Sequence, residues 1–432
     1  MYMTWDRRLK TPIRAIHPFP CYADRMVSPM MSRDEPRLLL CTRLCHLSQN
    51  RVRYPVNAVA WARDGRRAIT ANQNGEFTLW NGTAFNFEGL IAAHTSAVRA
   101  LAWSPSGATL LSGDTKGTIK YWESTMTPVN EIIETHGAQA VRDIKFASTD
   151  AKFASGADDG TVRIWDWERA IEERVLAGHG WDVKAVDWHP KYALIASGSK
   201  DNQVKLWDPR KRTCLATLYG HKHTVMKVAW NLVNMYWLLT ASRDQTLKLY
   251  DIRVLKNAET FKGHNREVTS CAWHPVSERV FASGAYDGTL NHWLVGVDEP
   301  LHSHQAHDQA IWDMEFHPVG HILATASNDH RAKFWSRQRP GENVVFSPEQ
   351  REYLMRFAEE RGIDPDLLFA PDPPDNNLGN SNKPPDQQLQ QQQQQNGSTG
   401  FAGDGRPPSS MKGGLVPILP QHNNNNNNNN IT

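Results

Sequence analysis

The sequence contains few cysteines, no long apolar run and no large excess of one charge. Its 432 residues include only five cysteines, and no two of them form a C-x-x-C pair. This odd number and spacing argue against a disulfide framework or a zinc site, and they predict reduced thiols in a cytosolic or nuclear protein. No stretch approaches the ~18 apolar residues of a membrane helix, and the N-terminus lacks a signal-peptide core. We therefore expect a soluble protein that does not span a membrane.

The net charge of +2 is unevenly distributed. Residues 1–60 hold ten Lys and Arg against four Asp and Glu. A basic end on a nearly neutral chain is typical of proteins that bind an acidic partner or nucleic acid. A solvated basic arm explains the same charge equally well.

Seven aromatic residues recur along the chain at intervals of 42 or 43 residues. A period of roughly 40–45 residues, with a His near the start and Trp-Asp near the end, is typical of WD-repeat propeller blades. We therefore predict an all-β fold, a seven-bladed WD-repeat β-propeller that serves mainly as a rigid binding platform. The recurring residues are Trp80, Trp122, Trp165, Trp207, Tyr250, Trp293 and Trp335.

Five repeats place a His, a Ser or Thr and an Asp at fixed distances before the aromatic residue. In WD-repeat proteins the carboxylate orients the His ring, the His meets the hydroxyl, and the hydroxyl reaches the indole N–H. One such set resembles hydrolase chemistry, but five sets in step with the fold period indicate architecture. We predict no catalytic residue, no metal site and no cofactor. The five sets are His136, Ser155, Asp159, Trp165; His179, Ser197, Asp201, Trp207; His221, Thr240, Asp244, Tyr250; His264, Ser283, Asp287, Trp293; and His307, Thr325, Asp329, Trp335.

Two repeats depart from this pattern. The first has Asn74 in the Asp position and no His at the expected spacing. The second has Lys116 in the Asp position, although it keeps His94, Ser112 and Trp122. We expect both blades to be held less tightly than the other five.

Composition divides the chain into four parts. Residues 1–37 form a basic, irregular extension, and residues 38–340 form the propeller, in which residues 38–46 supply the closing strand of the last blade. Residues 341–370 form a short helical appendage, because a Ser-Pro-Glu start is typical of a helix N-terminus. Residues 371–432 are rich in Asn, Gln and Pro, and we expect them to be disordered.

Several segments resemble one WD-repeat family in particular. The runs Gly75–Gly82 and Phe85–Glu88, and the last-blade run Ser327–His330, are similar to the WD-repeat subunit of the pre-mRNA cleavage and polyadenylation specificity factor. This is the family of the plant flowering-time protein FY. The resemblance covers roughly Trp5 to Gly341. The Phe85–Glu88 loop is the more specific evidence, because no rule of the propeller fold demands it.

The resemblance implies a non-enzymatic nuclear scaffold that helps to recognise an AAUAAA-type signal in pre-mRNA. The implied partners are a large multi-propeller scaffold subunit and a CCCH zinc-finger subunit, with no membrane and no small-molecule substrate. An aromatic and an aliphatic residue after the first blade pack against signal bases in this family, and single-stranded RNA is usually read by such stacking. Here the corresponding RNA-binding residues are Phe87 and Leu90, with Arg51 and Arg53 placed to meet phosphates, and the partner-binding residues are Arg7, Arg8 and Arg14.

Alternatives to these assignments remain. Phe87 could fill the seam between blades, and the two arginines could be solvated strand residues. The family has a longer basic arm ahead of the part that matches Arg14, so we predict membership of the complex ahead of direct RNA binding.

A second resemblance points to another class of function. The runs Trp207–Arg210 and Tyr250–Arg253 match the W/Y-D-x-R pattern of WD-repeat substrate receptors of cullin-type ubiquitin ligases. The arginine of that pattern helps a propeller to dock on a triple-propeller adaptor. The Phe85–Glu88 loop has no role in this alternative.

Overall fold

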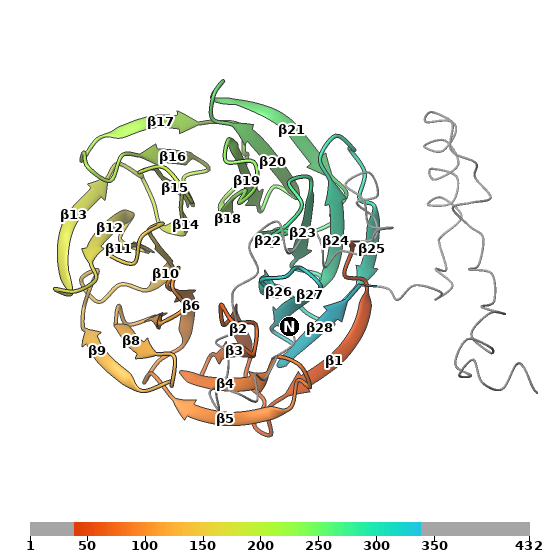
Figure 1. The fold of residues 1–432 in the computed structure, drawn as a ribbon. Coiled ribbons are helices and arrows are strands. Elements are labelled where there is room, and N and C mark those ends of the chain that lie inside the picture. The colour runs from red at the N-terminus through yellow and green to blue at the C-terminus, as the bar shows by residue number, and fades with distance from the viewer. Residues whose placement is uncertain (1–38, 338–432) are drawn as a thin grey trace, which may run out of the picture. The chain divides into compact units, whose positions relative to one another are not determined.

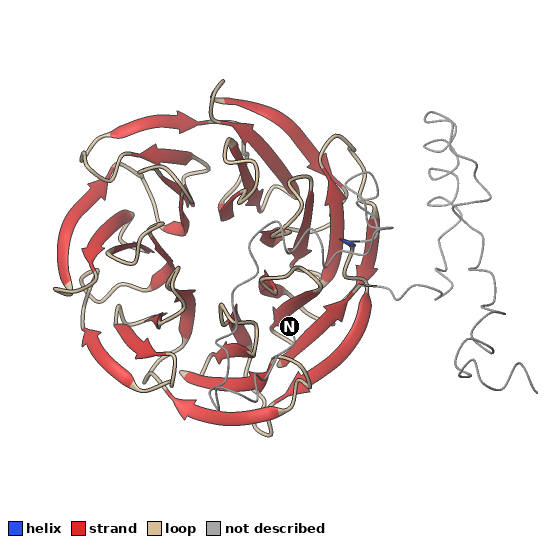
Figure 2. Cartoon of the chain, in the orientation of Figure 1, coloured by secondary structure: helices blue, strands red, loops and turns tan. Residues whose placement is uncertain are grey.

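The computed structural model describes residues 39–337, without the side chains of residues 256–258. The regular secondary structure of this part of the chain consists almost entirely of β-strands, joined by turns and loops (Figure 2). It contains no helix that is long and apolar enough to cross a membrane. The predicted extension at residues 1–37, appendage at 341–370 and tail at 371–432 lie outside the described residues.

Seven four-stranded antiparallel sheets surround a central axis, which confirms the predicted seven-bladed propeller (Figure 1). In blades one to six the chain runs from the innermost strand outwards, and each strand pairs with the next. Blades one to three are built from β2 (Val56–Trp61), β3 (Arg67–Asn72), β4 (Glu76–Asn81) and β5 (Phe87–Ala92); β6 (Val98–Trp103), β7 (Thr109–Asp114), β8 (Ile119–Glu123) and β9 (Pro128–Ile132); and β10 (Val141–Phe146), β11 (Lys152–Ala157), β12 (Thr161–Asp166) and β13 (Ile171–Ala177).

The remaining blades repeat this arrangement, apart from the outermost strand of blade seven. Their strands are β14 (Val183–Trp188), β15 (Ile195–Ser199), β16 (Val204–Trp207) and β17 (Cys214–Leu218) in blade four; β18 (Val225–Trp230), β19 (Trp237–Ser242), β20 (Thr246–Asp251) and β21 (Lys256–Lys262) in blade five; β22 (Val268–Trp273), β23 (Val280–Ala285), β24 (Thr289–Leu294) and β25 (His302–Gln305) in blade six; and β26 (Ile311–Phe316), β27 (Ile322–Ser327) and β28 (Arg331–Ser336) in blade seven.

Strand β1 (Arg43–Gln49) completes blade seven by pairing antiparallel with β28. The closing strand therefore comes from the N-terminal side, as the sequence predicts, but it begins at Arg43 and not at residue 38. Leu40 and Cys41 are buried against blades six and seven instead of extending the strand. Because β1 covers the outer edge of β28, the ring closes without leaving that edge open for pairing with another chain.

The core lies in the seams between neighbouring blades. Phe77 of blade one meets Trp122 of blade two edge to face, with ring centroids 5.3 Å apart. At the closing seam, Phe85 of blade one stacks on Phe334 of blade seven at 4.5 Å. Apolar side chains at alternate strand positions therefore pack each blade against its neighbours, and their burial is the main source of stability.

Polar contacts also join the turns that follow the innermost strands. In each contact a His or Asn side chain donates to a backbone carbonyl of the turn in the next blade. The four contacts, which we call the inter-blade turn contacts, run from His189 to Met235 (2.9 Å), from Asn231 to Glu278 (2.7 Å), from His274 to Gly320 (3.0 Å) and from His317 to Gly65 (3.2 Å).

Candidate functional site

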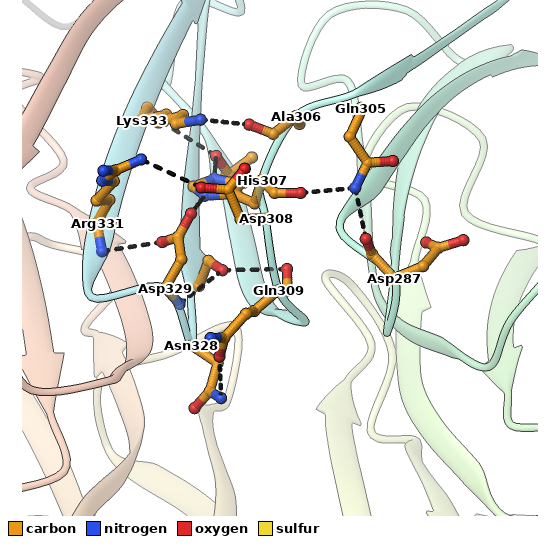
Figure 3. A network of polar contacts seen from close by, with 12 residues as sticks. Asp287, Gln305, Ala306, His307, Asp308, Gln309, Asn328, Asp329, Arg331 and Lys333 are labelled. Carbon is orange, nitrogen blue, oxygen red and sulfur yellow. Dashed lines mark hydrogen bonds and ion pairs between the residues drawn. The ribbon is translucent and has the colours of Figure 1, made fainter.

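The last blade shows how its repeated polar residues are used. His307 Nδ1 lies 2.8 Å from Asp329 Oδ2, and His307 Nε2 lies 2.8 Å from Thr325 Oγ1 (Figure 3). The indole N–H of Trp335 donates to the same Thr325 oxygen at 3.0 Å. We call this His, Ser/Thr, Asp and Trp arrangement a polar link. It ties the segment entering a blade to the blade's second and third strands and to the turn between those strands.

The structure brings together the predicted residues of blades three and four in the same way. The distances are 2.8, 2.7 and 2.8 Å for His136–Asp159, His136–Ser155 and Trp165–Ser155. They are 2.9, 2.6 and 2.7 Å for His179–Asp201, His179–Ser197 and Trp207–Ser197. Burial opposes ionisation of Asp159, but the hydrogen bond and charge of His136 overcome it, and the carboxyl pKa falls to about 2.

Blades five and six depart in part from the predicted sets. His221 meets Asp244 at 2.8 Å and Thr240 at 2.7 Å, but the Tyr250 hydroxyl donates to the Tyr219 carbonyl and not to Thr240. A tyrosine has no indole N–H and its hydroxyl extends further, so it reaches a different acceptor.

In blade six the predicted direct contact between His264 and Asp287 is wrong. His264 Nδ1 faces the Thr289 hydroxyl at 3.2 Å, and that hydroxyl donates to Asp287 at 2.6 Å. The Asn291 amide nitrogen lies within hydrogen-bond distance of the same ring nitrogen, at 3.4 Å. His264 still meets Ser283 at 2.6 Å, and Trp293 donates to Ser283 at 2.7 Å. Burial lowers the pKa of His264 to about 4, and the charge of Asp287 offsets only part of that effect.

The expectation that blade two is loosely held is also wrong. Asp114, the last residue of β7, supplies the carboxylate, with Oδ2 3.2 Å from His94 Nδ1. His94 Nε2 meets Ser112 at 2.7 Å, and Trp122 donates to Ser112 at 2.9 Å. Sequence spacing missed this carboxylate because it lies two residues before the position that Lys116 occupies. Burial opposes ionisation of Asp114, but its hydrogen bonds still lower the carboxyl pKa.

Blade one keeps only part of the link. Trp80 donates to Thr70 at 2.9 Å, and no His takes part. The Asn72 side-chain oxygen accepts the backbone N–H groups of Asn74 and Glu76, at 3.0 and 2.9 Å. An amide in the second strand thus fixes the turn that an Asp fixes in other blades.

The polar links have a structural role, since they join the parts of a blade. Residues 39–337 hold no group of three or more His, Cys, Asp or Glu side chains that could bind a metal ion. His221 belongs to the polar link of blade five.

Phe87 and Leu90 lie on β5, the outermost strand of blade one. Their side chains are 58% and 52% exposed, whereas Phe85 is only 6% exposed. The Phe87 ring rests edge-on against Trp80, with centroids 6.1 Å apart. Phe85 therefore fills the seam between blades, and Phe87 presents most of its ring to solvent.

Arg51 and Arg53 lie in the link between β1 and β2, and both are exposed. Asn50 in this link donates to Thr78 Oγ1 at 2.6 Å, and Thr78 is the strand partner of Leu90. This contact holds the link near the strands that carry the apolar residues. Among residues 39–337, no carboxylate pairs with either arginine.

Val52, between these arginines, is 58% exposed and was not singled out by sequence analysis. We call Arg51, Val52, Arg53, Phe87 and Leu90 the blade-one surface. Glu88 is a neighbouring acid, but its carboxylate pairs with Arg67 at 2.8 Å and not with Arg51 or Arg53. The surface thus combines exposed apolar side chains with two positive charges, the combination that contacts to bases and phosphates require.

The other predicted contact residues are placed differently. Arg7, Arg8 and Arg14 lie outside the described residues. The W/Y-D-x-R arginines fold back on their own repeats: Arg210 pairs with Asp208 at 3.0 Å, and Arg253 pairs with Asp251 at 2.5 Å.

Comparison with known proteins identifies the repeats. The family described as "WD domain, G-beta repeat" matches more than half of the chain. The matched segments are residues 86–123, 127–166, 171–208, 212–251, 255–293 and 298–336. The matches begin after the Trp of blade one, the blade that has no complete polar link.

Individual relatives are more specific. The chain is 41% identical over 178 residues to Polyadenylation factor subunit 2 of Neurospora crassa, covering 41% of this chain and 27% of the relative. It is 51% identical over 153 residues to the protein of the same name from Yarrowia lipolytica, covering 35% and 29%. A segment of 60 residues is 52% identical to Polyadenylation factor subunit 2 of Schizosaccharomyces pombe, covering 14% of this chain and 12% of the relative. Each match spans less than a third of the relative.

Proposed function

This chain belongs to the WD-repeat family, and from that premise we propose that it is a subunit of the nuclear pre-mRNA cleavage and polyadenylation complex. It acts there without catalysis, as a scaffold that helps to recognise an AAUAAA-type signal. Relatives named as polyadenylation factor subunits support a role in mRNA 3'-end processing. The observation that carries the finer proposal is the blade-one surface, where Phe87 and Leu90 are exposed and two arginines have no carboxylate partner among residues 39–337.

RNA recognition at this surface follows from the chemistry of its side chains. An unpaired base has two apolar faces, and stacking one of them on an exposed aromatic ring contributes ~1–3 kcal/mol. Phe87 offers such a ring, Leu90 covers the neighbouring base, and Arg51 and Arg53 neutralise phosphates. Phosphate contacts position the strand, whereas contacts to bases carry the sequence preference.

The proposed partners are a large multi-propeller scaffold subunit and a CCCH zinc-finger subunit, with contacts from Arg7, Arg8 and Arg14. Affinity purification of the intact protein followed by mass spectrometry tests this assembly. We expect both subunits to be recovered, and less of each after joint replacement of the three arginines by glutamine. Recovery of a cullin and its adaptor without RNA-processing factors would instead support the ligase alternative.

Replacing Phe87 with alanine is expected to weaken binding of the reconstituted complex to an AAUAAA oligonucleotide by ~1–3 kcal/mol, the stacking contribution of one base. Electrophoretic mobility shift or fluorescence anisotropy measures the change. Ile171→Ala is the matched control, because Ile171 is 60% exposed on the outermost strand of blade three. Unchanged affinity together with a lower melting temperature would show that the Phe87 ring only supports the fold.

The two arginines provide a complementary readout in the same experiment. Replacing both Arg51 and Arg53 with glutamine is expected to reduce the salt dependence of binding and to leave the preference for AAUAAA over a scrambled sequence nearly unchanged. A loss of sequence preference without a change in salt dependence would contradict their assignment to phosphates.

A further inference from the structure

A surface hollow of about 690 Å³ lies between blades five and six, away from the blade-one surface. Lys222 comes from the link between β17 and β18, Arg243 from the β19–β20 turn, and Arg266 from the link between β21 and β22. Tyr286 from the β23–β24 turn, Glu267 and Asp244 also line it, with His223 and Gln245 (strands labelled in Figure 1). The Asp244 oxygens already contact His221, the Lys222 N–H and Thr246. Segments from both blades therefore bring three positive charges and an aromatic ring together.

Within residues 39–337, no carboxylate pairs with Lys222, Arg243 or Arg266. A hollow of about 440 Å³ at the corresponding end of blades two and three differs in this respect. There Lys120 pairs with Glu131 at 3.2 Å, and Lys116 contacts the Thr95 hydroxyl. Three acids face these two lysines in the wall, Asp114, Glu131 and Glu134, whereas two acids face three positive charges in the first hollow. An excess of positive charge is therefore a feature of the hollow between blades five and six and not of the repeat itself.

The segments that carry these residues are held in place. The Arg243 N–H donates to the Thr224 carbonyl at 2.9 Å, and the Ser242 hydroxyl donates to the His223 carbonyl at 3.0 Å. On the blade-six side, the Tyr286 N–H donates to the Glu267 carbonyl at 2.9 Å. Because the backbone is already fixed, a ligand needs to order only the ends of the side chains, which lowers the cost of binding.

We infer that this hollow binds a phosphorylated Ser or Thr side chain in an extended segment of a partner protein. Two guanidinium groups and an ammonium group match a compact dianion with three acceptor oxygens. Tyr286, which is 50% exposed, provides an apolar face for the neighbouring residue of that segment. Glu267 favours a basic residue next to the phosphate, whereas it would repel the successive phosphates of an RNA strand. This inference does not depend on the proposed RNA function.

Fluorescence anisotropy with the full chain tests the inference. The probe is a labelled peptide mixture with a central phosphothreonine and degenerate flanking positions, compared with the same mixture unphosphorylated. We expect at least tenfold tighter binding of the phosphorylated mixture, and loss of that difference in Arg243→Gln with Arg266→Gln. Both arginines are exposed, so the melting temperature should stay unchanged.

Two matched variants sharpen the result. Lys116→Gln with Lys120→Gln removes two positive charges from the corresponding hollow of blades two and three, and it should leave peptide binding unchanged. Glu267→Gln should reduce the preference for peptides with a basic residue beside the phosphothreonine. Equal binding of the phosphorylated and unphosphorylated mixtures would overturn the inference. So would equally strong, Arg243-dependent binding of inorganic phosphate alone or of an oligoribonucleotide.

Discussion

Replacing Asp114 with alanine is expected to lower the free energy of unfolding by about 3 kcal/mol, because a buried carboxylate with several hydrogen bonds is removed. Asp114 is 1% exposed and meets His94 at 3.2 Å. Its other oxygen accepts the backbone N–H groups of Lys116 and Thr118, at 3.0 and 2.8 Å. Without the carboxylate, the buried His94 ring and the turn after β7 both lose partners.

Urea unfolding followed by tryptophan fluorescence measures this effect. Lys116→Ala is the control, since the Lys116 side chain makes a single hydrogen bond, to Thr95 at 3.4 Å near the surface, and the backbone N–H is kept in the variant. The loss of this side chain should cost less than about 0.5 kcal/mol. Asp201→Ala in blade four should cost ~1–3 kcal/mol, because it unpairs His179 in the same way. Similar values for the Asp114 and Lys116 variants would mean that the Asp114–His94 contact does not stabilise blade two.

The sequence predicts the fold well, because propeller architecture repeats with a period that single residues mark. The recurring Trp, Asp and His positions predict seven blades and an N-terminal closing strand, as the structure shows. The exact partners inside a blade depend on local geometry instead. Asp114 performs the role of a turn Asp from the end of a strand, and the Thr289 hydroxyl separates His264 from Asp287. The spacing of residues along the sequence does not determine which of two nearby polar side chains contacts the His ring.

The surface sites are less predictable for the same reason. Phe85 and Phe87 are the same amino acid and only two positions apart, yet Phe85 is buried and Phe87 is exposed. The turn before β5 directs Phe85 towards Phe334 of blade seven, a contact between residues 249 positions apart. The hollow near Arg243 likewise depends on four separate segments. Such arrangements follow from ring closure and not from local sequence pattern.

The inter-blade turn contacts that a histidine makes require a particular protonation state of its ring. A carbonyl can only accept, so His274 Nε2 must carry the proton that it donates to Gly320. His274 Nδ1 accepts the backbone N–H groups of Val276 and Ser277, at 3.2 and 3.1 Å, so it must be unprotonated. His317 is placed likewise, with Nε2 donating to Gly65 and Nδ1 accepting from Val319. Protonating either ring would place a second N–H against backbone donors.

Burial lowers the pKa of both His274 and His317 to about 4, and the hydrogen bond from each Nε2 to a carbonyl offsets only part of that effect. The unfolded chain takes up these protons near the ordinary pKa of about 6.5, whereas the folded protein takes them up only near pH 4. The stabilisation is therefore complete above pH 6.5 and is lost as the pH falls towards 4. Each ring contributes on the order of 3 kcal/mol to that loss.

Joint replacement of His274 and His317 with asparagine is expected to reduce the acid-induced loss of stability between pH 7 and pH 4.5 by several kcal/mol, because asparagine does not titrate. Blade five shows that asparagine fits such a turn. Asn231 Nδ2 donates to the Glu278 carbonyl at 2.7 Å, and its Oδ1 accepts the N–H groups of Val233 and Asn234.

Urea unfolding at a series of pH values measures the slope of stability against pH for the parent and the double variant. Asp159, with a pKa of about 2, does not obscure this window, because it loses its contribution only below pH 4. His264, whose pKa burial also lowers to about 4, is present in both proteins and contributes equally to both slopes. His46→Asn is the matched control, since His46 lies on β1 at the ring's outer edge and takes no part in the turn contacts. Parallel slopes for the parent and the double variant would show that the two turn histidines do not set the acid sensitivity of the ring.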